Sequence, residues 1–178
     1  MLDTRLLQAF NFLQPFKEAC VKPFLVLVLL LSCAAAFSQA KTKVAKDPWA
    51  GTYKLDLSKS KFSGPAPREE VINVASARRN SVKYTIAGKD VNGDSYTVNY
   101  EGKVGAASPE MMEGKTIAQI TYQMPSSHKF TAEGHGTDGS TSTGSIILSS
   151  DGKTITVDQH NKNAQGVEQD NSLVYVRQ

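Results

Sequence analysis

The sequence predicts an all-β fold, an antiparallel up-and-down barrel of about eight to ten strands that follows an N-terminal signal segment. Two observations carry this prediction. From Trp49 onward, apolar and polar residues alternate with a period of two, and β-branched and aromatic residues are common. Turn signals of two residues recur between the alternating runs, and no run has the period of a long helix.

The alternating runs predict about nine strands. In the first of them, Tyr53, Leu55 and Leu57 share one face. The predicted strands are 51–57, 70–77, 81–87, 95–101, 116–124, 128–133, 143–149, 154–160 and 167–177.

The connections favour hairpins between neighbouring strands. Asn92-Gly93, Asp138-Gly139 and Asp151-Gly152 are two-residue hairpin signals, because Asn and Asp tolerate positive φ and Gly adopts it freely. Gln165-Gly166 is a weaker signal of the same kind. A chain of hairpins predicts a meander.

A closed barrel leaves no free sheet edge, whereas a sandwich needs Greek-key crossings and longer connections. Only 58–67 and 104–115 are long enough for such crossings, so the barrel is favoured over the sandwich. Within the second of these segments, 109–113 is compatible with a single helical turn.

The N-terminal region predicts export. Residues 23–36 form an uncharged apolar run, Lys22 precedes it, and Ser38-Gln39-Ala40 follows with small residues at the first and third places. This is the pattern of a secretory signal. We therefore expect a signal over 1–40, a charged linker over 41–48 and the barrel domain over 49–178. The strongly apolar part is about a dozen residues, short for a membrane span, so an uncleaved anchor is the lesser alternative.

Two alternatives concern the same region. Leu30-Leu31-Ser32-Cys33 resembles a lipobox, in which Cys33 would be lipidated and anchor an exported lipoprotein. Residues 1–20 would be an annotation artefact if Val21 were the true start, because the signal would then have ordinary length. In each case the mature protein is expected in the periplasm or outside the cell, with no stable membrane span.

Composition excludes several functions. The net charge of +3 gives no clustered basic face, so we expect no nucleic-acid partner. Both cysteines, Cys20 and Cys33, precede the domain, which therefore has no disulfide, thiolate nucleophile or cysteine metal site. Oligomeric state does not follow from the sequence.

No catalytic constellation is visible, and we predict neither an enzyme nor a cofactor. Glu133 with His135, and Asp158 with His160, have the spacing of metal-binding pairs on a strand. Both pairs lie opposite the apolar faces, so we expect them outward and predict no metal site. The Gly/Ser/Thr-rich segment 134–144 lacks the lysine and following helix of a phosphate loop, and is read as a mobile hairpin loop.

The candidate ligand-binding residues are aromatic. Each lies on the apolar face of its predicted strand, and inward tyrosines combine an apolar ring with a hydroxyl. They are Tyr84, Tyr96, Tyr100, Tyr122 and Phe130. Gln159 and Asn161 continue an inward face toward one barrel mouth. The competing interpretation is that these rings simply fill the barrel, and a packed interior with no cavity of about 300 Å³ would favour it.

The chain also resembles a family. Its opening, 49–56 followed by Ser58-Lys59-Ser60-Lys61-Phe62, and its end, 151–157 and 174–178, are similar to those of exported lipocalin-like bacterial proteins. The resemblance implies a calyx-like barrel and brings no defined activity. Tyr53 stands where the lipocalin signature has a Trp, Trp49 is nearby, and Arg177 corresponds to the Arg that packs over that ring.

Two functions are compatible with this reading. The first is an exported lipocalin-like protein that binds a small apolar or amphipathic ligand. The second is a structural or interaction module of the cell envelope, with a packed barrel, no ligand, and functional loops at 104–115 and 134–144.

Overall fold

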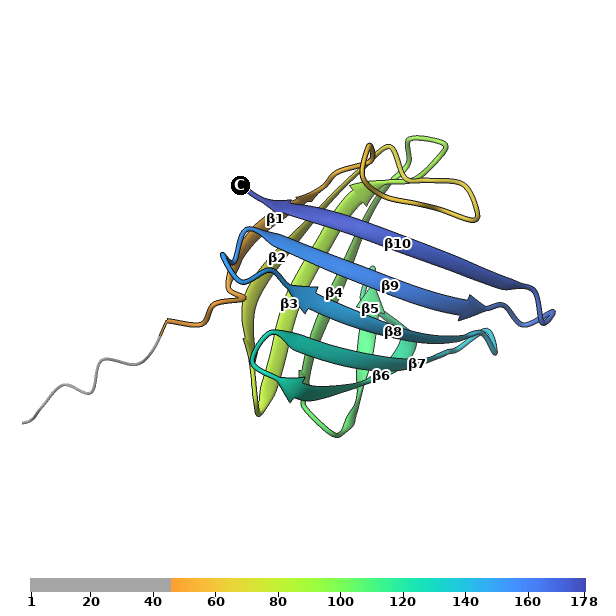
Figure 1. The fold of residues 1–178 in the computed structure, drawn as a ribbon. Helices are drawn as coiled ribbons and strands as arrows, with labels where there is room; N and C mark the ends of the chain where they lie inside the picture. The colour runs from red at the N-terminus through yellow and green to blue at the C-terminus, as the bar shows by residue number, and fades with distance from the viewer. Residues whose placement is uncertain (1–45) are drawn as a thin grey trace, which may run out of the picture. The chain divides into compact units, whose positions relative to one another are not determined.

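The computed structural model describes residues 46–178 and forms a closed, antiparallel up-and-down barrel (Figure 1). Each strand pairs with its neighbours in sequence, and β1 pairs with β10 to close the sheet. The ten strands are β1 (Gly51–Leu55), β2 (Glu69–Arg78), β3 (Ser81–Lys89), β4 (Ser95–Lys103), β5 (Ala107–Met112), β6 (Lys115–Ser126), β7 (Lys129–Gly136), β8 (Thr141–Leu148), β9 (Thr154–Lys162) and β10 (Glu168–Arg177). The predicted barrel is confirmed.

The predictions for the export signal, the start at Val21 and lipidation of Cys33 fall on residues 1–45, outside the described part of the chain. Within residues 46–178, no helix has the length and apolar character needed to cross a membrane.

Strand β5 corrects one prediction. The segment expected to hold a long connection and a helical turn is a strand, Ala107–Met112. Pro109 pairs with Gln119 of β6 and lies outside the β4–β5 ladder, which includes only Glu110–Met112, so β5 is an edge on the β4 side at this residue. The following turn places both Glu113 and Gly114 at positive φ, 51° and 76°, as a two-residue type I′ hairpin requires.

The structure also corrects the prediction of a mobile loop at 134–144. Strand β7 continues to Gly136 and β8 begins at Thr141, so only a four-residue turn separates them. Asp138 Oδ1 accepts hydrogen bonds from the Ser140 N–H and hydroxyl at 2.9 and 2.6 Å, which fixes that turn. A Cβ at Gly144 would lie 2.8 Å from the Asp158 carbonyl oxygen. The small residues therefore permit close strand packing, and the segment is not a mobile loop.

The first strand is shorter than predicted. It ends at Leu55, and Leu57 is 43% exposed instead of sharing the inward face. The reason is a turn at Asp56, whose Oδ1 accepts a hydrogen bond from the Ser58 N–H at 3.1 Å. The β1–β2 connection then runs beside β10 through a bridge between Lys61 and Ser172.

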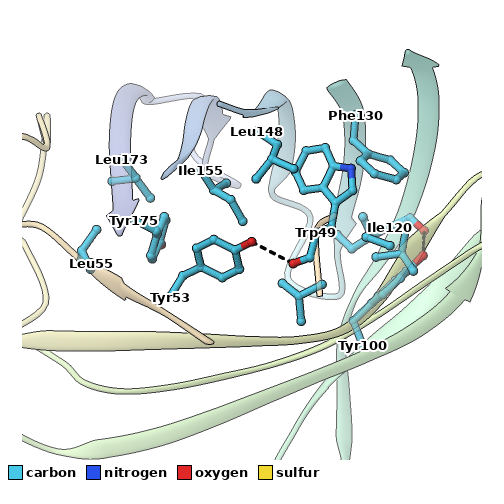
Figure 2. Close-up of a cluster of buried hydrophobic side chains, with 13 residues drawn as sticks. Trp49, Tyr53, Leu55, Tyr100, Ile120, Phe130, Leu148, Ile155, Leu173 and Tyr175 are labelled. Carbon is cyan, nitrogen blue, oxygen red and sulfur yellow. Dashed lines mark hydrogen bonds between the residues drawn. The ribbon is translucent and has the colours of Figure 1, made fainter. Parts of the chain in front are cut away.

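The segment before β1 closes one end of the barrel. Trp49 is 2% exposed, packs edge-on against Phe130 with ring centroids 5.1 Å apart, and donates from Nε1 to the Ser127 carbonyl at 2.9 Å. Figure 2 shows the indole beside Phe130, with the Tyr53 hydroxyl directed at the Trp49 carbonyl. We call Asp47, Trp49, Tyr53 and Arg177 the plug.

Two further contacts fix the plug. Asp47, placed in a linker by the sequence analysis, is 7% exposed and accepts hydrogen bonds from the Trp49 and Ala77 N–H groups. Arg177 lies over the Tyr53 ring, 4.6 Å from its centroid, and also donates to the Tyr53 hydroxyl. Its guanidinium further donates to the carbonyls of Pro48, Ala50 and Gly152, each at 2.7 Å. The packed domain thus begins at Asp47.

Candidate ligand-binding cavity

A cavity of about 210 Å³ lies inside the barrel, with Trp49 and Phe130 among the residues that line it. It extends along β7, β8 and β9 toward Ser142 and Gln159, which lie nearer the β7–β8 and β9–β10 turns. Aliphatic side chains make up most of the remaining wall. They include Ile72, Val74, Ile86, Ile146, Ile155 and Val157.

The polar centre of the cavity is a cluster of Glu110, Tyr84 and Tyr122. The Tyr84 hydroxyl donates to Glu110 Oε1 at 2.7 Å, and the two tyrosine hydroxyl oxygens are 3.0 Å apart. Because Tyr84 has one hydroxyl proton and directs it at the carboxylate, Tyr122 is the donor in the second bond. The three residues come from β5, β3 and β6, and the side chains form a relay that ends at Glu110. We call them the Glu110 cluster.

Perpendicular aromatic rings surround this cluster. The rings of Tyr84 and Tyr122 meet at 90° with centroids 6.3 Å apart, and those of Tyr122 and Phe130 at 89° and 6.1 Å. Such edge-to-face contacts direct ring edges at ring faces, the favourable arrangement for their quadrupoles. These contacts pack the rings against one another beside the carboxylate.

Burial shifts the protonation of the cluster. It raises the pKa of Glu110, against the opposing effect of the Tyr84 hydrogen bond. Burial likewise raises the pKa of Tyr84 and of Tyr122, so both hydroxyls keep their protons at neutral pH. Among the described residues, none of the ion pairs includes Glu110. A carboxylate held in an apolar cavity without a cation is costly to ionise.

The predicted aromatic residues divide into three positions. Tyr84, Tyr122 and Phe130 line the cavity. Tyr100 is 2% exposed and stacks behind Tyr84 with centroids 5.3 Å apart, so it supports the wall without reaching the space. Tyr96 lies elsewhere, beside Glu70 in a second hollow under the β1–β2 connection.

Glu70 is a second inward carboxylate with a different environment. Tyr96 donates to its Oε2 and Tyr175 donates to its Oε1. Each oxygen thus has a tyrosine partner, whereas in the Glu110 cluster the Tyr84 hydroxyl is directed at Oε1.

Sequence reasoning missed Glu110 and Trp49 as cavity residues. Glu110 was missed because Pro109 argued against a strand at 107–112, so no inward face was assigned there. Glu113-Gly114, a weak two-residue hairpin signal, is the feature that could have indicated the strand. Trp49 was assigned to the start of the domain but not to its interior. The inward position predicted for Gln159 agrees with its place in the cavity wall, and Asn161 is half-buried on the same face.

The histidine pairs do not converge. Glu133 and His135 are exposed and bond only to each other, Oε1 to Nε2 at 3.2 Å. His160 pairs with Asp170 at 2.8 Å, while Asp158 accepts a hydrogen bond from Ser172. Within residues 46–178, no three His, Cys, Asp or Glu side chains gather in a way that could hold a metal ion.

The cavity volume limits what could fit. It is below the roughly 300 Å³ of ordinary small-molecule pockets, yet the interior is not fully packed. An engineered cavity of about 150 Å³ admits benzene, so this space suits a molecule of roughly eight to ten non-hydrogen atoms.

Comparisons with known proteins give little beyond the architecture. No protein-family model matches the chain, and no curated protein matches it. One similar solved structure is a redesigned β-barrel, 9% identical, covering 74% of this chain and 92% of that one with a TM-score of 0.46. Another is EF1p2_mFAP2b bound to DFHBI, 10% identical, covering 74% and 94% with a TM-score of 0.47. We base the fold on the strand pairing of the chain itself.

Proposed function

We propose that this protein is an exported, lipocalin-like barrel that binds a small amphipathic molecule inside the sheet. The observation that supports it is the 210 Å³ cavity, whose wall is mainly aliphatic and aromatic and carries a few polar groups. Binding sites for small molecules combine an apolar wall with a few placed polar groups in this way. Export and the family resemblance are supported by the sequence patterns described above.

The apolar wall would supply most of the affinity, and the Glu110 cluster would orient the ligand. A ligand of roughly ten non-hydrogen atoms gains at most about 1.5 kcal/mol for each, and usually much less. We therefore expect micromolar to millimolar affinity, suited to capture or carriage of an abundant compound.

Native mass spectrometry of the protein purified from its own host tests the proposal. Because ligands of this affinity are lost on washing, the protein is sprayed together with a small-molecule extract of its host, and we expect an adduct that leaves on mild activation. Ala132 lines the cavity, so Ala132→Phe should fill it and abolish the adduct. Glu133→Phe places the same ring on the exposed outer face of the same strand and should leave the adduct in place.

A protein that carries no small molecule from its host, and that binds no small aromatic probe, would favour the ligand-free envelope module instead. The segments proposed as functional loops, 104–115 and 134–144, are mostly strand in the structure. Only short turns remain on either side of β5 and between β7 and β8.

A further inference from the structure

The only charge that residues 46–178 place on the cavity wall is negative. Among the described residues that line it, Glu110 is the sole Asp, Glu, Lys, Arg or His side chain. A fatty acid or other anion placed against Glu110 would meet a like charge in a low-dielectric space, where Coulomb repulsion is much stronger than in water. The wall therefore disfavours anionic ligands.

The carboxylate also keeps unused acceptor capacity. A carboxylate has two oxygens and about four lone-pair sites, and the Tyr84 hydroxyl is directed at Oε1. Glu70 provides the contrast, because tyrosine hydroxyls from Tyr96 and Tyr175 are directed at its two oxygens. A donor brought by a ligand finds room on Glu110.

The rings next to Glu110 favour a positive charge in particular. Tyr84, Tyr122 and Phe130 line the same cavity as the carboxylate, and Tyr100 covers one face of Tyr84. A cation over an aromatic face within about 6 Å of its centroid gains electrostatic attraction, which grows when water is excluded. A neutral hydrogen-bond donor gains neither this cation–π attraction nor the charge pairing with Glu110.

We propose that the ligand is a small protonated amine with an apolar body, whose ammonium group pairs with Glu110 and packs against Tyr84 and Tyr122. This rests on the proposed binding function and names its substrate class. The apolar body lies between Phe130 and the aliphatic wall. Tyr122 and Tyr84, acting through their hydroxyl relay, stabilise the ionised carboxylate.

Three probes of similar size test the charge preference: 2-phenylethylamine, 2-phenylethanol and phenylacetate. Each is titrated at neutral pH into the protein expressed and purified from its own host, with binding followed by amide NMR shifts. We expect the amine to bind about tenfold or more tightly than the alcohol, the size expected for a hydrogen bond to a charged group. Phenylacetate should bind more weakly than both.

Glu110→Gln keeps the shape and the acceptor for Tyr84 but removes the charge. We expect it to reduce amine affinity to that of the alcohol while alcohol affinity stays within about twofold, which also shows that the variant folds. Glu70→Gln is the matched control and should keep the amine preference.

The outcomes separate the two proposals. Equal affinity of wild-type protein for amine and alcohol would overturn the amine assignment and leave the binding function standing. An amine preference that persists in Glu110→Gln would overturn it as well. Failure of all three probes to bind would overturn both.

Discussion

The plug and the Glu110 cluster use the same kinds of residue in opposite ways. In the plug, Arg177 reaches the carbonyls of Pro48, Ala50 and Gly152, and Asp47 reaches the N–H groups of Trp49 and Ala77. In the Glu110 cluster, the hydrogen bonds join one side chain to another, and the carboxylate has no cation partner among the described residues. Polar groups tied to the main chain fix the fold, while polar groups tied to each other around a space are available to a ligand. Substitutions in the two regions should therefore differ in kind.

The largest effect is expected at Trp49. Replacing it with Ala removes a fully packed ring and its bond to Ser127, and should lower the free energy of unfolding by about 4 kcal/mol. Urea denaturation followed by circular dichroism measures this. Trp49→Phe, which keeps most of the ring, should cost about 1–2 kcal/mol and remain folded. Val167→Ala, on the exposed surface, is the control. A loss at Trp49 no larger than at Val167 would mean that the plug does not hold the fold.

Arg177→Lys should have the next largest effect. A lysine ammonium is a compact charge and cannot reach three separate carbonyls while stacking on Tyr53. We expect a loss of about 2 kcal/mol in the same denaturation experiment. Arg79→Lys, at an exposed turn, should change the unfolding free energy by less than about 0.5 kcal/mol. Similar behaviour of the two variants would assign the guanidinium contacts no role in stability.

Amine binding should depend on pH through Glu110. Burial raises its pKa, and the facing groups Tyr84, Tyr122 and Tyr100 have pKa values raised by burial as well. Among these four groups, Glu110 alone changes charge as the solution becomes acidic. Affinity for 2-phenylethylamine should fall as the pH drops through the raised pKa of Glu110, approaching tenfold per pH unit below it. Titrations at several pH values measure this. The 2-phenylethanol affinity should stay nearly constant, and a parallel decline of both probes would point to acid unfolding instead.

The smallest effect is expected on the stability of the empty protein. The raised pKa means that the folded state binds the Glu110 proton more tightly than the unfolded state does. This adds to the free energy of unfolding below the ordinary pKa of 4.5, and the added stability is lost as the pH rises through the raised pKa. Glu110→Gln should therefore raise Tm at neutral pH, by less than about 5 °C, and lose this advantage in acid. Thermal melts against pH measure it. A lower Tm for Glu110→Gln at neutral pH would place Glu110 with the plug as a structural group.

The sequence was informative where period-two alternation was strong. It predicted the closed barrel, the inward faces of β3, β4 and β6, and the outward positions of Glu133 and His160. The prediction failed where one residue interrupted the alternation. Pro109 prevented the prediction of β5, and Glu110 was therefore not recognised as an inward residue. The prediction also failed for contacts between distant segments. Asp47 binds Ala77 across 30 positions, and no local pattern marks that pairing.

The three residues of the Glu110 cluster illustrate the same limit. Tyr84 and Tyr122 could be placed inside the barrel from their own strands, because alternation fixes which face a side chain occupies. Their convergence on a carboxylate depends on the order of strands β3 to β6 and on the register shift between Glu110 and Met111. A bulge of this kind redirects side chains and leaves little trace in composition.

The guanidinium of Arg177 has a consequence for how the chain acquires its structure. It joins the last strand to Pro48 and Ala50, 129 and 127 positions earlier. Contacts of such long range form late, because their loop-closure entropy must be met before they stabilise anything. The contacts of the plug can form only when β10 is present. The barrel therefore remains unclosed until its last strand has paired with β1.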